Sequence, residues 1–317
     1  MVLSDGEVVN FADCHHGVTF SSGPLRWAAE KLGAEETRKL VSQPARRGGV
    51  PTGGAEIVLS GEPTSFEPSG DAWLPDLQVL IARGAGSPSE QLILAAKGGH
   101  NGEWHNHNDV GTFIVHWRGE SLVCDLGAPL YTKKTFSPQR YELLATRSLG
   151  HNVPLLNETE QVEGAEHAAE VLACEVEKDT ARFSLQIAGA YPEGASLESL
   201  VRTLELRRGD AECVELTDEV RFGGAAGSYR LPLYTKGRFE IVADGCVRAV
   251  GERGALRIEF DPQSLTAELE EVEHGDGALE QQFGPTLTRC MFALRESAEQ
   301  AEVRLRFTPA GNAQVTA

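Results

Sequence analysis

The sequence predicts a mainly β protein, a large antiparallel two-sheet β-sandwich preceded by a short helical segment. From about Leu77 onward, runs such as LVRTLELR, ECVELTDEVRF and AEVRLRF alternate apolar with polar or charged residues, which is the period of a half-buried strand. Turn sequences such as GGAAG, ADG and ERG separate these runs, and many strands joined by short turns favour antiparallel pairing. We therefore expect about fifteen strands in residues 76–317.

Residues 1–75 differ from the rest and are expected to form a helical segment followed by a linker. Pro24 precedes LRWAAEKL and Gly33, and AEETRKLV follows, which predicts two short helices with Pro near a start and Gly at a stop. The stretch from Gln43 to Gly70 is dense in Pro, Gly and Ser and contains one strand-like run, EIVL. The β domain is therefore placed directly after this linker.

The composition is that of a folded, acidic protein. Hydrophobic residues make up 41% of the 317 residues and charged residues 24%, which excludes a disordered or collagen-like chain. Asp and Glu number 47 against 29 Lys and Arg, giving a formal net charge of −18 at pH 7. This charge repels phosphate backbones and anionic lipid head groups, so we expect neither nucleic acid nor membrane partners. A polyanionic saccharide stays compatible, because a local cationic cleft can overrule the global sign.

Two features bear on the cellular location of the chain. The N-terminal run MVLSDGEVVNF has no basic region followed by an apolar one, so we expect a cytoplasmic location for the chain as written. A periplasmic location is expected if the true N-terminus lies upstream. The cysteines form no CxxC pair and are expected to be free, buried thiols in a reducing compartment. They are Cys14, Cys124, Cys174, Cys213, Cys246 and Cys290.

The polar residues that suggest chemistry gather in one segment, GGHNGEWHNHNDVGTFIVHW, and in the two β segments after it. His105 and His107 are two residues apart, so in an extended chain both rings project from the same face. Asp125 follows on the next β segment, and His151 lies beyond it. Two histidines and one aspartate suit Zn²⁺, so this spacing indicates a metal site. The competing interpretation is a buried, hydrogen-bonded His–Asp pair without a metal.

The run HNHNDVGTF, the D-x-G of Asp125 and Gly127, the nearby Tyr131 and the later R-Y…S…H-N resemble the signature of a known family. That family is the heparinase II/III-like polysaccharide lyases, which include alginate and heparan sulfate lyases. The resemblance spans Asp5 to about Asn157 and implies an (α/α) toroid followed by an antiparallel β-sandwich, with the active site between them. The opening DGEVVNFAD resembles the end of the toroid, so we expect this chain to carry chiefly the β domain.

The resemblance also implies a reaction and a role for each site residue. β-Elimination removes the C5 proton of a uronic acid, which requires a base, neutralisation of the carboxylate and protonation of the leaving oxygen. His105 would be the catalytic histidine, while His107, Asp125 and His151 would hold a structural Zn²⁺ that orders the loop. The family's catalytic Tyr and its carboxylate-neutralising Asn or Glu come from the toroid. We therefore expect this chain to be inactive without a toroid domain or a separate toroid chain.

The other polar residues of the segment have competing interpretations. His100 and Arg140 are candidates for binding the anionic saccharide, with local hydrogen bonding or ion pairing as the alternative. The alternative for His105 is likewise a loop histidine that bonds its neighbours. We expect the following residues to serve turns, caps or strands: Asn106, Asn108, Asp109, His116 and Tyr131. The Cys14-His15-His16 cluster is assigned no role.

Three other functions compete with the lyase. A cupin-like metal protein would share Gly99, His105 and His107, but Gly111 and Thr112 stand where its motif requires a Glu. A metal-dependent amidohydrolase also begins with H-x-H, but it needs the alternating strands and helices of a barrel. The main alternative is therefore a non-catalytic carbohydrate-binding or partner-docking β domain.

Overall fold

The computed structural model of the protein describes residues 2–4, 7–14, 70–87 and 89–311, and strands dominate this part of the chain. Its largest sheet has eight antiparallel strands in the order β11-β12-β13-β14-β21-β18-β17-β16. These strands are β11 (Glu170–Val176), β12 (Thr180–Gln186), β13 (Leu197–Arg207), β14 (Cys213–Phe222), β16 (Arg238–Ala243), β17 (Cys246–Val250), β18 (Ala255–Glu259) and β21 (Gln300–Ala310). The alternation in LESLVRTLELR lets β13 bury every second side chain along most of its length, which gives the sheet one apolar face.

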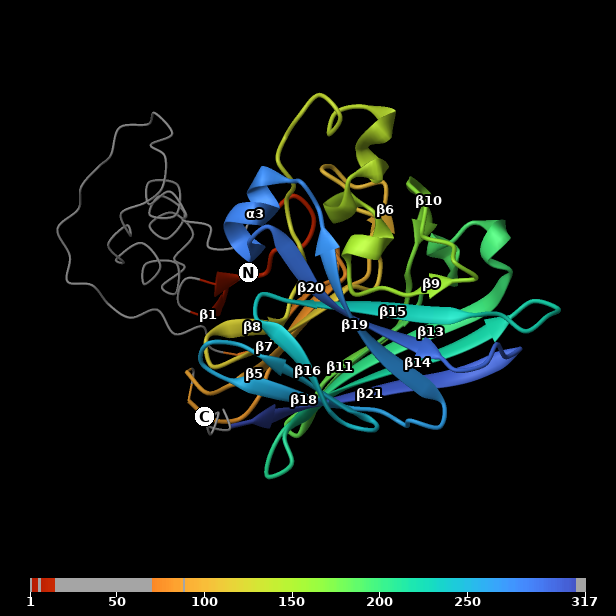
Figure 1. The fold of residues 1–317 in the computed structure, drawn as a ribbon. Helices are drawn as coiled ribbons and strands as arrows, with labels where there is room; N and C mark the ends of the chain where they lie inside the picture. Colours follow the sequence, from red (N-terminus) through yellow and green to blue (C-terminus); the bar gives the residue numbers. More distant parts are fainter. Residues whose placement is uncertain (1, 5–6, 15–69, 88, 312–317) are drawn as a thin grey trace, which may run out of the picture.

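Two further sheets supply the opposing side of the core (Figure 1). The five-stranded sheet contains β3 (Ala72–Leu74), β4 (Val79–Arg83), β5 (Leu92–Lys97), β7 (Phe113–Trp117) and β8 (Glu120–Val123). The four-stranded sheet contains β19 (Leu265–Glu273), β20 (Thr286–Leu294), β15 (Tyr229–Thr235) and β9 (Leu155–Leu156). An isolated bridge between Cys124 and Tyr234 joins the end of β8 to β15. Rings of Phe113 and Phe307 meet across the core at 5.8 Å, and the predicted antiparallel sandwich is confirmed.

The five-stranded sheet departs from the expected alternation because both of its faces are covered. β4, β5 and β7 are buried at every position, and their sequences are mostly apolar rather than alternating. One face joins the sandwich core, and the other packs against an N-terminal segment, residues 2–4 and 7–14. A separate apolar cluster on this outer face contains Leu3, Val9, Phe11, Val79, Ile81, Ile93, Ala95 and Ile114. The N-terminal segment is therefore part of the β domain.

Helical structure is confined to one end of the sandwich in the part of the chain that the structure describes (Figure 1). The helix α3 (Gly277–Phe283) begins at Asp276, whose carboxylate accepts hydrogen bonds from two backbone N–H groups. Three 3₁₀ turns, η1 (Pro138–Glu142), η2 (Leu144–Thr146) and η3 (Ser148–Gly150), follow β8 and lead to His151. No described helix is long and apolar enough to cross a membrane.

The helices expected after Pro24 and the linker from Gln43 onward lie outside the described residues, apart from Gly70. Five cysteines are free thiols, as expected: Cys124, Cys174, Cys213, Cys246 and Cys290. Cys14 and Cys174 differ from the expectation in being only partly buried.

His116 in β7 gives the fold a pH dependence that can be measured. It lies in the strand, as expected, and is 1% exposed, with Nδ1 bonded to Ser121 Oγ at 3.1 Å. Its Nε2 has no partner among the described residues. Burial lowers the pKa of His116 to about 4. The unfolded chain binds a proton near pH 6.5 and the folded chain only near pH 4, so stability falls as the pH drops between these values.

We expect the His116→Gln variant to lose less stability than the wild type as the pH falls. The wild-type free energy of unfolding should fall by up to about 3 kcal/mol through His116 alone between pH 7 and pH 4, at about 1.4 kcal/mol per pKa unit. Urea denaturation at both pH values measures the difference. His167→Gln, a partly exposed histidine, should keep the wild-type slope. Equal slopes for wild type and His116→Gln would contradict the assignment.

Candidate functional site

The histidine loop lies between β6 (His100–Asn101) and β7, and backbone hydrogen bonds hold it in place. The Asn108 N–H donates to the Thr146 carbonyl at 3.0 Å. The Gln161 side chain accepts from the Val110 N–H at 3.0 Å and donates to its carbonyl at 2.8 Å, as a neighbouring strand would. His105 takes a left-handed backbone conformation with φ of 60°, which turns the chain between the two histidines. The rings of this loop are therefore fixed by its backbone.

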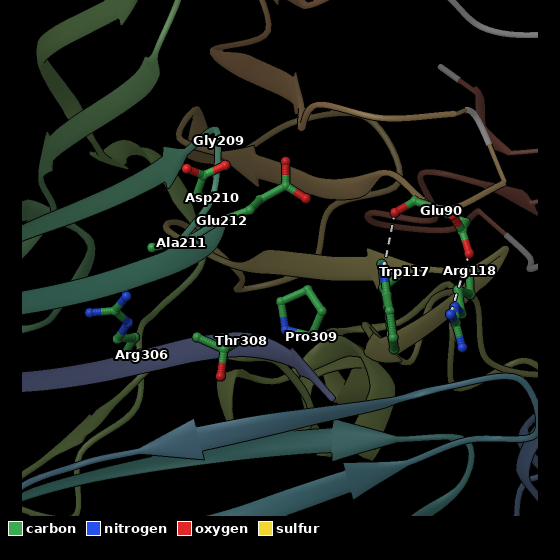
Figure 2. Close-up of a pocket in the computed structure, with 10 residues that line it drawn as sticks. All are labelled: Glu90, Trp117, Arg118, Gly209, Asp210, Ala211, Glu212, Arg306, Thr308 and Pro309. Atoms are coloured by element: carbon green, nitrogen blue, oxygen red, sulfur yellow. Dashed lines mark hydrogen bonds and ion pairs between the residues drawn. The ribbon is translucent and has the colours of Figure 1, made fainter. Parts of the chain in front are cut away.

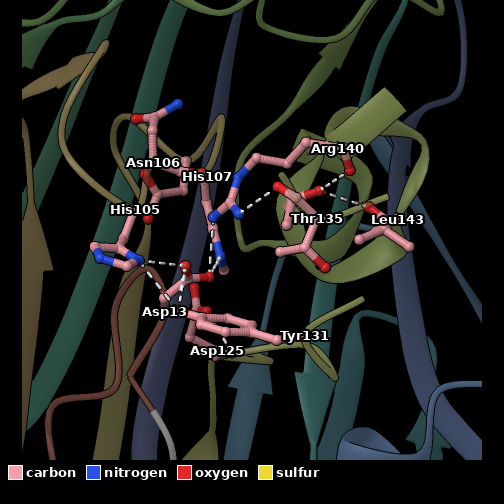
Figure 3. A network of polar contacts seen from close by, with 12 residues as sticks. Asp13, His105, Asn106, His107, Asp125, Tyr131, Thr135, Arg140 and Leu143 are labelled. Carbon is pink, nitrogen blue, oxygen red and sulfur yellow. Dashed lines mark hydrogen bonds and ion pairs between the residues drawn. The ribbon is translucent and has the colours of Figure 1, made fainter. Parts of the chain in front are cut away.

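Asp13 lies at the centre of a polar network that contains both of these histidines (Figure 3). Its Oδ1 lies 2.8 Å from Nε2 of His107 and 2.9 Å from Nη2 of Arg140. Its Oδ2 lies 3.0 Å from Nδ1 of His105 and 2.7 Å from the hydroxyl of Tyr131. Burial favours the neutral acid, but the hydrogen bonds from His107 and Tyr131 outweigh it, and the pKa of Asp13 lies well below its usual value. Asp13 is therefore an anion.

Contacts on both sides of Asp13 hold it at this position. The Asn10 side chain donates to the Asp125 carbonyl at 3.0 Å, and the Ala128 N–H donates to the Cys14 carbonyl at 3.2 Å. The N-terminal segment thus lies along the stretch that carries Asp125. The sequence indicates no role for Asp13, because 92 residues separate it from His105. The sole signal is its place in the run DGEVVNFAD.

A second, fully buried group lies beside this network and can hold a metal ion. Ligand atoms of Asp109, Asp125 and His151 lie within 4.8 Å of one another. Nδ1 of His151 is 2.8 Å from Oδ2 of Asp125, and the Thr112 hydroxyl donates to the same oxygen at 3.0 Å. Burial works against both charges, but their mutual attraction raises the pKa of His151 and lowers that of Asp125 to about 2.

Unpartnered atoms in this buried region support a metal. Among the described residues, no hydrogen bond reaches Nε2 of His151, Nδ1 of His107 or Oδ2 of Asp109. The rings of His107 and His151 are 5.1 Å apart, and Oδ1 of Asp109 lies 2.6 Å from the buried ammonium of Lys97. Buried polar atoms without partners are costly, and imidazole nitrogens with carboxylate oxygens are the donors that Zn²⁺ takes. The residues present therefore fit a metal ion.

The structure brings the predicted metal residues together and adds one. Asp125 and His151 belong to the buried group, and His107 lies beside it. The competing interpretation, a hydrogen-bonded His–Asp pair, also describes the contact between His151 and Asp125. Asp109 begins a turn, as expected, because its carbonyl accepts a hydrogen bond from the Thr112 N–H at 2.9 Å, but its carboxylate pairs with Lys97 instead of a backbone N–H. Its buried position next to a cation explains why a polar-turn interpretation was insufficient.

The predicted catalytic and binding residues occupy different surroundings. The His105 side chain is 58% exposed, and next to it Trp104 is 95% exposed. Arg140 directs its donors to Asp13, to the Asn106 carbonyl at 2.9 Å and to the Thr135 carbonyl at 3.2 Å. Its guanidinium is thus engaged within the protein.

His100 and Tyr131 also have defined contacts. In β6, His100 accepts a hydrogen bond from the Gly102 N–H at 3.1 Å and has no bond to the Asp13 network among the described residues. Tyr131 was expected to be structural, yet its hydroxyl bonds Asp13 and lies 3.1 Å from Nδ1 of His105. Burial and the bond to Asp13 raise the pKa of Tyr131 to about 12, so it keeps its proton at neutral pH.

An open hollow of about 550 Å³ lies at the other end of β7, beside Trp117 (Figure 2). Its wall includes three carboxylates, from Glu90, Asp210 and Glu212, against two guanidinium groups. This charge balance does not suit an anionic ligand. The histidine loop enters β7 from Phe113, so the hollow is separate from the site.

A buried arginine links the site to the sandwich core. Arg202 in β13 is fully buried and donates from Nη1 to the Gly111 carbonyl at 2.9 Å and the Asn152 carbonyl at 2.8 Å. Its other two donors bind Asp218 at 2.8 and 2.6 Å, and Tyr229 donates to the same carboxylate. Gly111 ends the histidine loop and Asn152 follows His151. One side chain therefore fixes both segments.

Comparison with known proteins gives a family and a fold. The sequence matches the family model Heparinase II/III-like, C-terminal, over residues 76–311. A mutant of the heparan sulfate lyase HepC from Pedobacter heparinus has a TM-score of 0.69 at 14% identity, and a heparinase III gene product has 0.67 at 16%. The alignments cover 96% of this chain but 44% and 43% of those chains, so it spans less than half their length. No curated protein matches the sequence.

We expect Arg202→Met to destabilise the protein strongly. The substitution leaves the Asp218 carboxylate buried without its cation, which typically costs about 3–5 kcal/mol of unfolding free energy. Urea denaturation measures the loss. Arg182→Met, on the exposed side of β12, is the matched control and should change stability by about 0.5 kcal/mol or less. A loss for Arg202→Met no larger than the control's would contradict this account.

Proposed function

Because the chain belongs to the heparinase II/III-like C-terminal family, we propose that it is the β-sandwich part of a polysaccharide lyase. Its substrate would be a polysaccharide containing uronic acid, cleaved by β-elimination. The structural neighbour from Pedobacter heparinus is a heparan sulfate lyase, which supports an anionic substrate class. The fold itself does not identify the reaction, so the site has to carry the argument.

The proposed reaction removes a proton and a leaving group from adjacent carbons. A base takes the proton from C5 of the uronic acid, next to the carboxylate. The electrons of that C–H bond form a C4–C5 double bond as the C4–O bond breaks, and the departing oxygen takes up a proton. The site must therefore offer a base with a free lone pair at its surface.

His105 provides such a base, and this is the observation that carries the proposal. Its ring is more than half exposed, while Nδ1 is held between Asp13 and Tyr131. No hydrogen bond reaches its Nε2 from the described residues, so this nitrogen can accept a proton from a bound sugar. Histidine is the side chain that most often serves as a general base in enzymes.

We also propose that the buried group holds a structural Zn²⁺. Asp125 and His151 of this group and the neighbouring His107 would be its ligands, and Asp109, the third member of the group, offers a further carboxylate. Bound there, Zn²⁺ would supply positive charge among buried carboxylates and couple the order of the histidine loop to metal binding.

In this proposal, neutralisation of the substrate carboxylate would come from outside the described residues. The two cations nearest the histidines are already paired, Arg140 with Asp13 and Lys97 with Asp109. This pairing supports a contribution from a toroid domain, on the same or a separate chain, which would bring the catalytic Tyr as well. Arg140 is thereby a weaker candidate for substrate binding than its position in the sequence suggests.

The second candidate function is a non-catalytic carbohydrate-binding or partner-docking domain. Trp104 supports it, because an indole that is 95% exposed beside the site could stack on a sugar ring or pack on another domain. In that case the histidines would position the loop without proton transfer. Turnover measurements on His105 variants separate the two functions.

We expect the purified chain to retain about one equivalent of Zn²⁺. His151→Ala should lose the metal and lower the melting temperature, since metal binding is coupled to folding. Elemental analysis and thermal denaturation, with and without a chelator, measure both effects. His167→Ala, outside the site, should retain the metal. Protein prepared without chelator that holds no metal, together with an unchanged melting temperature for His151→Ala, would rule the site out.

We expect His105→Gln to lower lyase turnover by about 10²–10⁴-fold, the usual contribution of a positioned base. The chain is assayed alone and with a complementing toroid, on a panel of uronate polysaccharides, by the ultraviolet absorbance of the unsaturated product. The chain alone should be inactive or nearly so. His100→Gln should raise KM and spare kcat, because His100 is a candidate for substrate binding. Unchanged turnover in His105→Gln would favour the binding domain instead.

A further inference from the structure

The Asp13 carboxylate is used to its full capacity as a hydrogen-bond acceptor. An ionised carboxylate accepts about four hydrogen bonds and donates none. Asp13 receives two at each oxygen: from His107 and Arg140 at Oδ1, and from His105 and Tyr131 at Oδ2. Arg140 and Tyr131 can act only as donors to a carboxylate. The two histidine nitrogens that face Asp13 must therefore each carry a proton.

This requirement gives the two histidines opposite tautomers. His107 faces Asp13 with Nε2, so its proton lies there and its lone pair is on Nδ1, which is buried and unpartnered beside His151. His105 faces Asp13 with Nδ1, so its lone pair is on Nε2, on a ring that is more than half exposed. One carboxylate thus leaves one lone pair free inside the protein and another at its surface.

The position of Asp13 is fixed independently of the histidines. Phe11 packs against the five-stranded sheet and is 8% exposed, and Asn10 and Cys14 bond the stretch from Asp125 to Ala128. Rotation of the carboxylate would break its bonds to both Arg140 and Tyr131. The N-terminal segment therefore holds an acceptor in one orientation against both rings.

We propose that Asp13 is a positioning residue that sets the tautomers of His105 and His107 together. It would keep Nδ1 of His107 available to a metal and Nε2 of His105 available to take a proton. The catalytic meaning of the second role rests on the proposed lyase function. The tautomers themselves do not depend on it.

The test uses ¹⁵N NMR of the full chain labelled at histidine, with His105→Gln and His107→Gln to assign the signals. In the zinc-free wild type, we expect His105 protonated at Nδ1 and His107 at Nε2. Asp13→Asn replaces one acceptor oxygen by an NH₂ donor, so at least one histidine should change or lose its single tautomer. Zn²⁺ affinity, measured by competition with a chelator, should fall by about 10–100-fold, as for other residues that orient metal ligands.

Asp71→Asn is the matched control, because Asp71 also accepts from an arginine, Arg208, but has no contact with either histidine. It should change neither tautomers nor Zn²⁺ affinity. A wild-type His105 protonated at Nε2, or His107 at Nδ1, would overturn the proposal, even if Asp13→Asn fails to fold. So would an Asp13→Asn protein with wild-type tautomers and affinity. If the tautomers are as expected but the chain shows no elimination of uronates, even with a toroid, the lyase function is rejected. The positioning role of Asp13 is then retained.

Discussion

The five-stranded sheet has two apolar faces, and both must be covered for its strands to exclude water. The sandwich core covers one face, and Leu3, Val9 and Phe11 cover the other. Burial of apolar area is worth about 25 cal/mol per Å², so this cover stabilises the sheet while it fixes the course of the N-terminal segment. The segment then continues along the stretch that carries Asp125. The packing of these apolar side chains thus sets the position of Asp13.

Polar groups inside the domain are positioned in a similar way, because each buried polar group needs a hydrogen-bond partner. Arg202 satisfies Asp218 and two loop carbonyls, and Gln161 satisfies both backbone groups of Val110. These two side chains thereby give hydrogen-bond partners to polar groups near the core. Against this background, the unpartnered atoms of His107, Asp109 and His151 stand out. Other buried atoms, such as Nε2 of His116, also lack a partner among the described residues. The physical argument for a metal is that two imidazole nitrogens and a carboxylate oxygen without partners lie in one buried place, and these are the donors that Zn²⁺ takes.

The sequence predicts the parts of this protein that rest on local pattern. Alternation in β13 and β14 indicates the sandwich, and the spacing of His105 and His107 indicates the site. Asp13 escapes prediction because its partners lie far away in the sequence, and nothing local distinguishes it from a solvated acid. Asp109 escapes because Asn-Asp sequences usually form turns, and only the buried ammonium of Lys97 changes its role.

Some long-range contacts can be predicted from a local feature of the sequence. Arg202 lies in phase with Leu200 and Leu204 on the inward face of β13, so a charged residue interrupts an apolar series. Such a residue must meet an acid inside the core. The acid, Asp218, lies in the neighbouring strand directly opposite Arg202. Once the register between β13 and β14 is known, it identifies Arg202 and Asp218 as an ion pair.

The packing of the N-terminal segment on the sandwich affects which parts of the chain could be exchanged as a unit. The family match begins at residue 76, yet the domain uses side chains that precede this point by more than sixty residues. A gene fusion that transferred residues 76–311 alone would carry the histidines without Asp13 and would expose Ile81, Ile93 and Ile114. The described parts of the N-terminal segment and the sandwich would therefore have to be transferred together to keep this face covered.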